Sequence, residues 1–182
     1  MNLPNILTVM RIVLIPLFVG AFLINGISDW ITLALFGIAA ITDALDGYIA
    51  RKQNIVTDFG KLMDPLADKL MVMSAFICFC AEGYLGAVVT VLIMAREFLV
   101  TWVRSFAASK NKIIAADVLG KVKTIAQDVT IVVILIQSAT GSPNASFIGV
   151  ISYLCIHIMA ILTVVSAINY FIKNKDLFIN KE

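Results

Sequence analysis

Residues 42–68 read TDALDGYIARKQNIVTDFGKLMDPLAD, and within them four aspartates stand at helical spacing in or beside long apolar stretches. These are Asp43, Asp46, Asp64 and Asp68. An acidic residue within a transmembrane helix costs about 2.5 to 3.5 kcal/mol on insertion scales, so four of them require about 10 kcal/mol of compensation. A divalent cation would supply it, because hard cations select oxygen ligands and neutralise carboxylate charge. The pattern therefore predicts a metal site formed by converging aspartates.

The first pair of aspartates shares one helix face, because Asp43 and Asp46 are separated by three residues. Gly47 and Ala50 continue that face. Side chains this small leave room for a phosphate to approach the helix backbone. We therefore expect a charged spot beside an open groove.

The second pair repeats this arrangement on the next predicted helix. Gly60, Asp64 and Asp68 are spaced four residues apart and lie on one face. Pro65 disfavours helical geometry at the residue before it and removes one backbone donor. We therefore expect the helix to start or bend at Pro65, which would aim Asp64 inward.

A connection of about ten residues on the cytoplasmic side should make these two helices antiparallel neighbours with converging acidic faces. Arg51 and Thr57 border the site from this connection, and both side chains can donate hydrogen bonds to phosphate. The alternative is that the acids form salt bridges with Arg51, Lys61 and Lys69. Such pairing could satisfy one or two of the four acids but not all of them.

The composition is that of an all-α integral membrane protein. The 182 residues are 60% hydrophobic and 14% charged, with a mean hydropathy of +0.97, whereas soluble domains average about 25% charged residues. No linker or repeat divides the chain, so residues 1–182 are expected to form a single domain. A spanning helix needs about 20 mostly apolar residues. Six stretches qualify, near residues 6–25, 30–50, 61–80, 84–107, 121–139 and 147–171.

The distribution of Lys and Arg predicts the orientation, because cytoplasmic segments carry the excess of these residues. The connections at 26–29, 81–83 and 140–146 contain none of the 14 Lys and Arg residues. We therefore expect both termini, and the carboxylate site, on the cytoplasmic side.

The aspartate-containing segment resembles the signature of the CDP-alcohol phosphotransferases. That signature reads D-x-x-D-G-x-x-A-R, eight residues, G, three residues, D, three residues, D, and this chain fills every fixed position with the correct spacing. The resemblance extends to the whole chain, since six transmembrane helices with cytoplasmic termini are similar to the family's fold. Members transfer a phosphate-linked group from a CDP-alcohol to an acceptor hydroxyl, release CMP, and use two divalent cations, Mg²⁺ or Mn²⁺.

The resemblance implies a role for each matching position. Asp43, Asp46 and Asp64 would ligate the metals, and Asp68 would complete the second metal's shell and accept the proton of the attacking hydroxyl. The CDP-diacylglycerol site would include Gly47, Ala50, Arg51, Thr57 and Gly60.

Three further segments resemble bacterial phosphatidylglycerophosphate synthases. In LPNILTVMR (3–11), Asn5 and Thr8 would contact the nucleotide. The segments AREFLVTWVR (95–104) and GKVKTIAQD (120–128) carry cations within predicted helices, which require an anionic partner. Glu97 can satisfy only part of this charge. The phosphate of sn-glycerol 3-phosphate is the expected ligand of Arg96, Arg104, Lys121 and Lys123.

The expected activity is therefore transfer of the phosphatidyl group of CDP-diacylglycerol to sn-glycerol 3-phosphate. Alternative acceptors within the family are inositol phosphate, serine and phosphatidylglycerol. A divalent-cation transporter is a remote alternative, because transport favours midplane ligands and broken helices in paired halves, whereas these acids cluster in one half of the sequence. We expect a homodimer in the bacterial cytoplasmic membrane, with the active site facing the cytoplasm, membrane lipids as partners and no nucleic-acid partner.

Overall fold

The computed structural model describes residues 3–25, 30–53, 58–110, 114 and 117–175, and in this part of the chain all regular structure is helical. The predicted all-α fold with six helices is confirmed, and the predicted boundaries agree with the observed ones to within three residues. The helices are α1 (Leu3–Asn25), α2 (Trp30–Gln53), α3 (Asp58–Ala81), α4 (Ala87–Ser109), α5 (Val118–Ala139) and α6 (Phe147–Lys173).

We expected the helix to start or bend at Pro65, and a start there is wrong, because α3 begins at Asp58 and runs through Pro65; a bend at Pro65 stays a prediction. A proline inside a helix leaves a backbone carbonyl without its usual partner. Helices packed among other helices tolerate this, since neighbouring groups can satisfy the freed carbonyl.

Local turn chemistry explains two of the helix connections. After α3, Gly83 adopts a φ of 79°, and after α5, Gly141 adopts a φ of 59°, a region that L-residues with a side chain rarely occupy. Ser146 then caps α6 by accepting a hydrogen bond from the backbone N–H of Gly149 at 3.1 Å.

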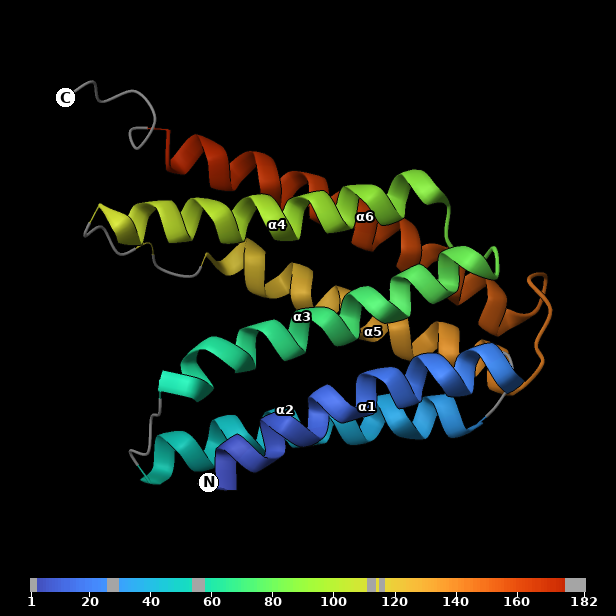
Figure 1. Cartoon of the computed structure of the whole chain (residues 1–182). Helices are drawn as coiled ribbons and strands as arrows, with labels where there is room; N and C mark the ends of the chain where they lie inside the picture. Colours follow the sequence, from blue (N-terminus) through green and yellow to red (C-terminus); the bar gives the residue numbers. More distant parts are fainter. Residues whose placement is uncertain (1–2, 26–29, 54–57, 111–113, 115–116, 176–182) are drawn as a thin grey trace.

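The helices run alternately up and down, so the start of α1 and the end of α6 lie at the same end of the bundle (Figure 1). Helix α1 packs mainly against α2 and α3, whereas α6 packs mainly against α5 and α4. The end of α2, the start of α3, the end of α4 and the start of α5 lie at this same end (Figure 1). Residues near these helix ends are therefore neighbours in space, although they are far apart in sequence.

Three described segments are apolar and long enough to cross a membrane, by length and composition alone: Asn5–Ile24, Trp30–Gly47 and Phe147–Lys173. Large apolar side chains such as Leu23, Val88 and Phe147 are exposed on the outside of the bundle. Such exposure suits a protein whose solvent is lipid. Helices α3, α4 and α5 carry more charge, and several of their charged side chains face the interior.

The apolar core occupies the half of the bundle that is farther from the start of α1 and the end of α6. Phe18 and Phe22 of α1 pack there with Phe36 of α2 and with Phe76 and Phe79 of α3. The other half of the bundle holds the buried charged residues Arg11, Asp46 and Lys123. The candidate site therefore lies at the end of the bundle where α1 begins.

Candidate active site

Arg11 joins the two aspartates of α2 to α1. Its Nη2 donates a hydrogen bond to Asp46 Oδ2, and its Nη1 lies 2.8 Å from Asp43 Oδ1. The Arg11 side chain is only 1% exposed and that of Asp46 only 5%. Asp43 and Asp46 therefore do share a helix face, and in this structure they converge on a cation.

Asp64 of α3 also contacts α1, one turn before Arg11. Thr8 donates a hydrogen bond through Oγ1 to Asp64 Oδ1, and the Thr8 side chain is fully buried. One turn of α1 therefore presents Thr8 to α3 and Arg11 to α2. This explains how α1 brings the two halves of the acidic segment together.

A cavity of about 100 Å³ lies between these helices. Its polar lining consists of Arg11, Asp43, Asp68 and Asp128, the last contributed by α5. Among the described residues, no three acidic, histidine or cysteine side chains lie close enough together to hold one metal ion. The donor set nevertheless suits a hard cation, because it consists of carboxylate oxygens and one of its acids, Asp43, already pairs with the guanidinium of Arg11.

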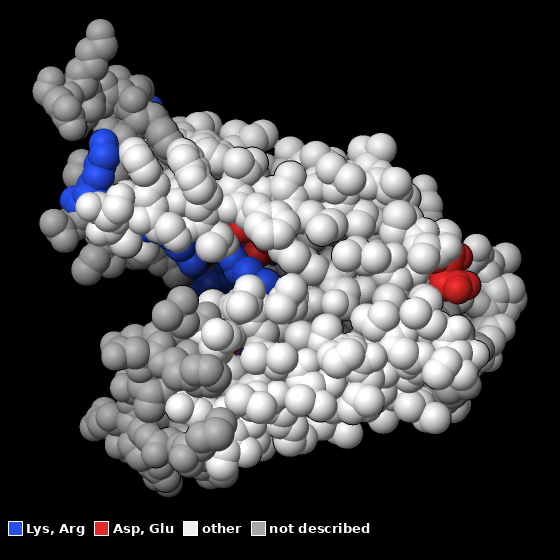
Figure 2. Space-filling view, in the orientation of Figure 1, with Lys and Arg blue, Asp and Glu red and all other residues white. Residues whose placement is uncertain are grey.

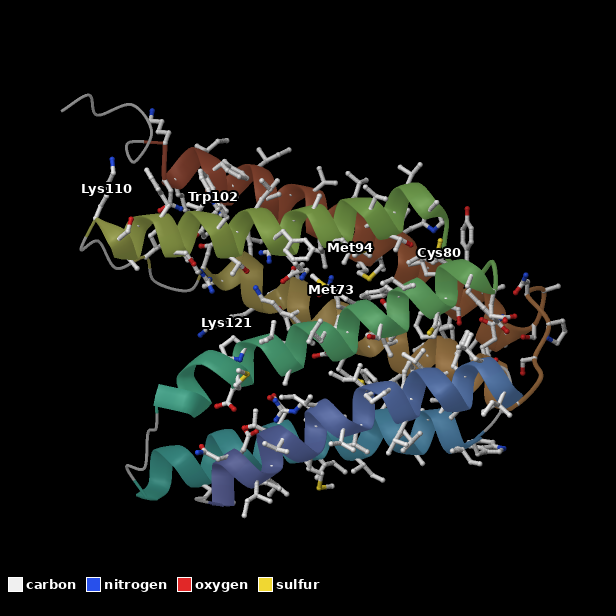
Figure 3. All side chains as sticks on the ribbon, in the orientation of Figure 1. Met73, Cys80, Met94, Trp102, Lys110 and Lys121 are labelled. Carbon is white, nitrogen blue, oxygen red and sulfur yellow. The ribbon has the colours of Figure 1, made fainter. Side chains whose placement is uncertain are left out.

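A second cavity opens between α3, α4 and α5 and has a volume of about 220 Å³. It is the larger of these two cavities, and the one beside Arg11 is the smaller. Figure 2 shows Lys and Arg atoms gathered in a notch at the end of the molecule where α1 begins, with acidic atoms beside them. In Figure 3, Lys121 of α5 points into the opening between α3 and α4. The charged and polar residues that line this cavity are Asp68, Lys69, Arg96, Glu97, Arg104, Asp117, Lys121, Thr124 and Gln127.

Glu97 organises the cations of this second cavity. Its Oε1 lies 3.0 Å from Arg96 Nη1 and also accepts a hydrogen bond from Lys123 Nζ. Lys69 Nζ lies 4.0 Å from the other carboxylate oxygen of Glu97 and donates a hydrogen bond to Thr101. One carboxylate therefore faces three cations from three helices, so the group retains a net positive charge.

The rim of the second cavity is fastened to the end of α6. Asp117, which precedes α5, accepts hydrogen bonds from Asn169 Nδ2 and Lys173 Nζ, both at 2.6 Å. The hydrogen bond from Lys173 lowers the pKa of the Asp117 carboxyl below its usual value, so Asp117 is charged at neutral pH. Arg104 lies nearby, with its guanidinium 5.9 Å from the centre of the Tyr170 ring.

Asp68 is common to both cavities. On one side it faces the space lined by Arg11, Asp43 and Asp128, and on the other it faces the basic residues of α4 and α5. A group on this shared wall can contact a ligand that reaches in from either cavity. This position suits a proton acceptor between an anionic donor substrate and an anionic acceptor.

Comparison with known proteins agrees with this geometry. Residues 1–170 match the CDP-alcohol phosphatidyltransferase family. The chain belongs to this family. The family resemblance inferred from the aspartate spacing is thereby confirmed.

Two bacterial relatives cover nearly the whole of this CDP-alcohol phosphatidyltransferase. The CDP-diacylglycerol–glycerol-3-phosphate 3-phosphatidyltransferase of Rickettsia bellii is 39% identical, over 97% of this chain and 97% of that protein. The enzyme of the same name from Bacillus subtilis is 38% identical, over 95% of each chain. A cardiolipin synthase (CMP-forming) of Oryza sativa subsp. japonica is 33% identical over 93% of this chain, which spans 56% of that protein.

The residues predicted to hold the nucleotide are only partly described in this CDP-alcohol phosphatidyltransferase. Gly47 is half-buried on α2, and Gly60 is buried in the first turn of α3. Thr57 and the side chains of Ala50 and Arg51 lie outside the described part of the chain. Asn5 is half-buried on α1, one turn before Thr8.

The predicted acceptor residues come together in the transferase. Arg96, Arg104 and Lys121 line the larger cavity, and Lys123 lies buried behind Glu97. Arg96 and Arg104 are eight positions apart, about 12 Å along α4 at 1.5 Å per residue, and both still line the same cavity.

Several residues that line or border the two cavities had no such role predicted from the sequence. Arg11 had no assigned role, although a lone arginine in an apolar helix signals a buried carboxylate partner. Lys69 was considered only as a salt-bridge partner of the aspartates, but it approaches Glu97 instead. Gln127 and Asp128 end the segment GKVKTIAQD (120–128), but helical spacing alone did not indicate which neighbouring helices α5 would contact.

Proposed function

We propose that this CDP-alcohol phosphatidyltransferase transfers the phosphatidyl group of CDP-diacylglycerol to sn-glycerol 3-phosphate, giving phosphatidylglycerophosphate and CMP. The observation that carries the proposal is the place of Asp68, on the wall between a carboxylate-lined cavity and a cation-lined one. The names of the two bacterial relatives that match almost end to end support the same donor and acceptor.

The size and charge of the larger cavity favour a small phosphorylated acceptor. The cavity has a volume of about 220 Å³. That space suits an acceptor of the size of glycerol 3-phosphate better than a second phospholipid. Arg96, Arg104 and Lys121 would bind its phosphate, because charge-assisted hydrogen bonds to phosphate are among the stronger protein contacts. Lys123, buried beside Glu97, would add positive charge to this site.

Asp68 would act as the general base. It accepts the proton of the acceptor's terminal hydroxyl, whose oxygen forms a bond to the phosphatidyl phosphorus. The bond between that phosphorus and the bridging oxygen then breaks, and CMP leaves with the electron pair. Glu97 keeps the cations in place during this step and leaves them enough net charge to hold the acceptor phosphate.

Asp43, Asp46, Asp64 and Asp68 would hold two divalent cations, Mg²⁺ or Mn²⁺. When bound, these ions polarise the diphosphate and neutralise the charge that develops on CMP. Arg11 and Thr8 orient the carboxylates of α2 and α3 in their absence.

The CDP group would lie along the small side chains beside these acids. Gly47, Ala50 and Gly60 allow the diphosphate close to the backbone, and Arg51 and Thr57 add donors. Asn5 and Thr8 would contact the nucleotide from α1.

The chain would form one domain of six transmembrane helices, with both termini and the active site on the cytoplasmic side of a bacterial cytoplasmic membrane. The charged helices α3, α4 and α5 can span the bilayer because their polar side chains face the bundle interior. A homodimer is the expected assembly.

The direct test incubates the purified protein, in lipid nanodiscs with Mg²⁺ and CDP-diacylglycerol, with a panel of acceptors while CMP release is measured. We expect sn-glycerol 3-phosphate to be the preferred acceptor over inositol phosphate, serine, phosphatidylglycerol and unphosphorylated glycerol. Preference for any other member of the panel would overturn the acceptor assignment. If no acceptor in the panel led to CMP release, the transferase activity itself would be overturned.

A further inference from the structure

Gln127 of α5 carries a buried hydrogen-bond donor that no group in the described part of the chain satisfies. The residue is only 2% exposed, it lines the larger cavity, and its Nε2 has no hydrogen-bond partner among the described residues. Buried polar groups in folded proteins are almost always paired. An unpaired donor on a cavity wall therefore points to a ligand that enters the cavity.

A second glutamine on the same helix shows that α5 does not leave amides unpaired in general. Gln137 is equally buried, at 2% exposure. Its Nε2 donates to Asn144 Oδ1 at 2.9 Å and to the backbone oxygen of Ser142 at 3.4 Å. Gln137 also lines a cavity, but its partner Asn144 lines that same cavity, whereas Gln127 lies on the wall of the cavity beside Asp68 and the cations.

The place of Gln127 along α5 indicates which part of an acceptor it would meet. It lies six residues beyond Lys121, or about 9 Å further along the helix axis. Its neighbour Asp128 lines the smaller cavity together with Asp68, so Gln127 sits at the depth of the proposed base. An uncharged carboxamide at this depth suits a hydroxyl rather than the phosphate.

We infer that Gln127 determines specificity by donating a hydrogen bond to the second, non-reacting hydroxyl of a phosphorylated diol. The inference rests on the proposed function. With the acceptor's phosphate at Lys121 and its attacking hydroxyl at Asp68, the remaining hydroxyl on the middle carbon lies between them, beside the Gln127 amide. Gln127 thus distinguishes a glycerol phosphate from a phosphorylated alcohol that lacks this hydroxyl.

The test compares two acceptors, sn-glycerol 3-phosphate and 3-hydroxypropyl phosphate, which lacks only the middle hydroxyl. We expect the wild-type protein to prefer the first by about tenfold or more in kcat/KM, since a site built to bind a hydroxyl rejects the analogue without it. Gln127→Met keeps the length of the side chain but removes the donor. It should lower kcat/KM for glycerol 3-phosphate about tenfold, leave the analogue nearly unaffected and thereby remove the preference.

Gln137→Met is the matched control, because it alters an equally buried glutamine of α5 whose amide is already paired. It should retain the wild-type preference even where it lowers thermal stability. Gln127→Asn, which withdraws the amide by one methylene, serves as a second variant if the methionine variant does not fold, and it should also reduce the preference.

An unchanged preference in a folded Gln127 variant would overturn the inference while leaving the proposed function intact. A wild-type protein that uses both phosphates equally would do the same. If the wild-type protein releases no CMP with either acceptor, the proposed function itself fails.

Discussion

Arg11 of α1 donates a hydrogen bond to Asp46 of α2, and both side chains are almost completely buried, at 1% and 5% exposure. The same guanidinium lies beside Asp43. A buried charge that loses its partner costs far more than an exposed one, because neither water nor another ion replaces the lost contact. This pair therefore fixes how α1 packs against the helix that carries the first two aspartates.

Arg11→Met should destabilise the fold by about 3–5 kcal/mol, the cost of leaving a buried partner uncompensated. Denaturant unfolding in detergent micelles would measure the change. The double variant Arg11→Met with Asp46→Asn should lose less stability than Arg11→Met alone, because no full charge at position 46 remains unpaired. Lys173→Met is the control: it removes a pair with Asp117 whose lysine is 57% exposed, and an exposed pair contributes little to stability because water screens it. Equal losses from Arg11→Met and Lys173→Met would contradict this account of the buried pair.

Asp68→Asn should reduce kcat by about 10²–10⁴-fold, the range that general-base catalysis supplies. An amide keeps the shape of the side chain but cannot accept the hydroxyl proton as a carboxylate does. CDP-diacylglycerol binding, followed by titration into nanodiscs, should remain measurable. Retention of more than about a tenth of the wild-type activity would rule out Asp68 as the base.

Removal of divalent cations with EDTA should abolish CMP release, and added Mg²⁺ or Mn²⁺ should restore it, because bare carboxylates would repel the diphosphate. Asp43→Ala, Asp46→Ala and Asp64→Ala should each raise the metal concentration needed for half-maximal activity. Glu82→Gln is the control, since Glu82 is exposed in the turn after α3 at the far end of the bundle. Full activity of the stripped protein in chelator would exclude the two-metal mechanism.

Alanine substitution of Arg96, Arg104, Lys121 or Lys123 should raise KM for glycerol 3-phosphate more than KM for CDP-diacylglycerol. A residue that contacts the phosphate directly should show an increase of roughly 10–100-fold, equivalent to about 1.5–3 kcal/mol for a charge-assisted bond. Lys110→Ala is the matched control, because Lys110 is an exposed cation at the end of α4 that lies over the Phe106 ring. The acceptor site would have to lie elsewhere if all four variants kept the wild-type KM for glycerol 3-phosphate.

Much of the fold follows from local sequence pattern. Apolar length alone predicts the six helices, because a run of about 20 apolar residues forms a helix that satisfies its own backbone hydrogen bonds. Pro65 shows the limit of that reasoning. Its local preference predicts a helix start, but α3 continues through it, since packing among other helices outweighs the preference of one residue.

The sequence by itself determined the family and the helix face that Asp43 and Asp46 share, because helical spacing is a local property. Only the tertiary structure decided which helix meets each face. In the folded chain Arg11 donates a hydrogen bond to Asp46, and Thr8 donates one to Asp64. Glu97 contacts both Arg96 and Lys123. Asp68 lines two cavities. These contacts join helices far apart in the chain, and the spacing along one helix carries no information about the register of another.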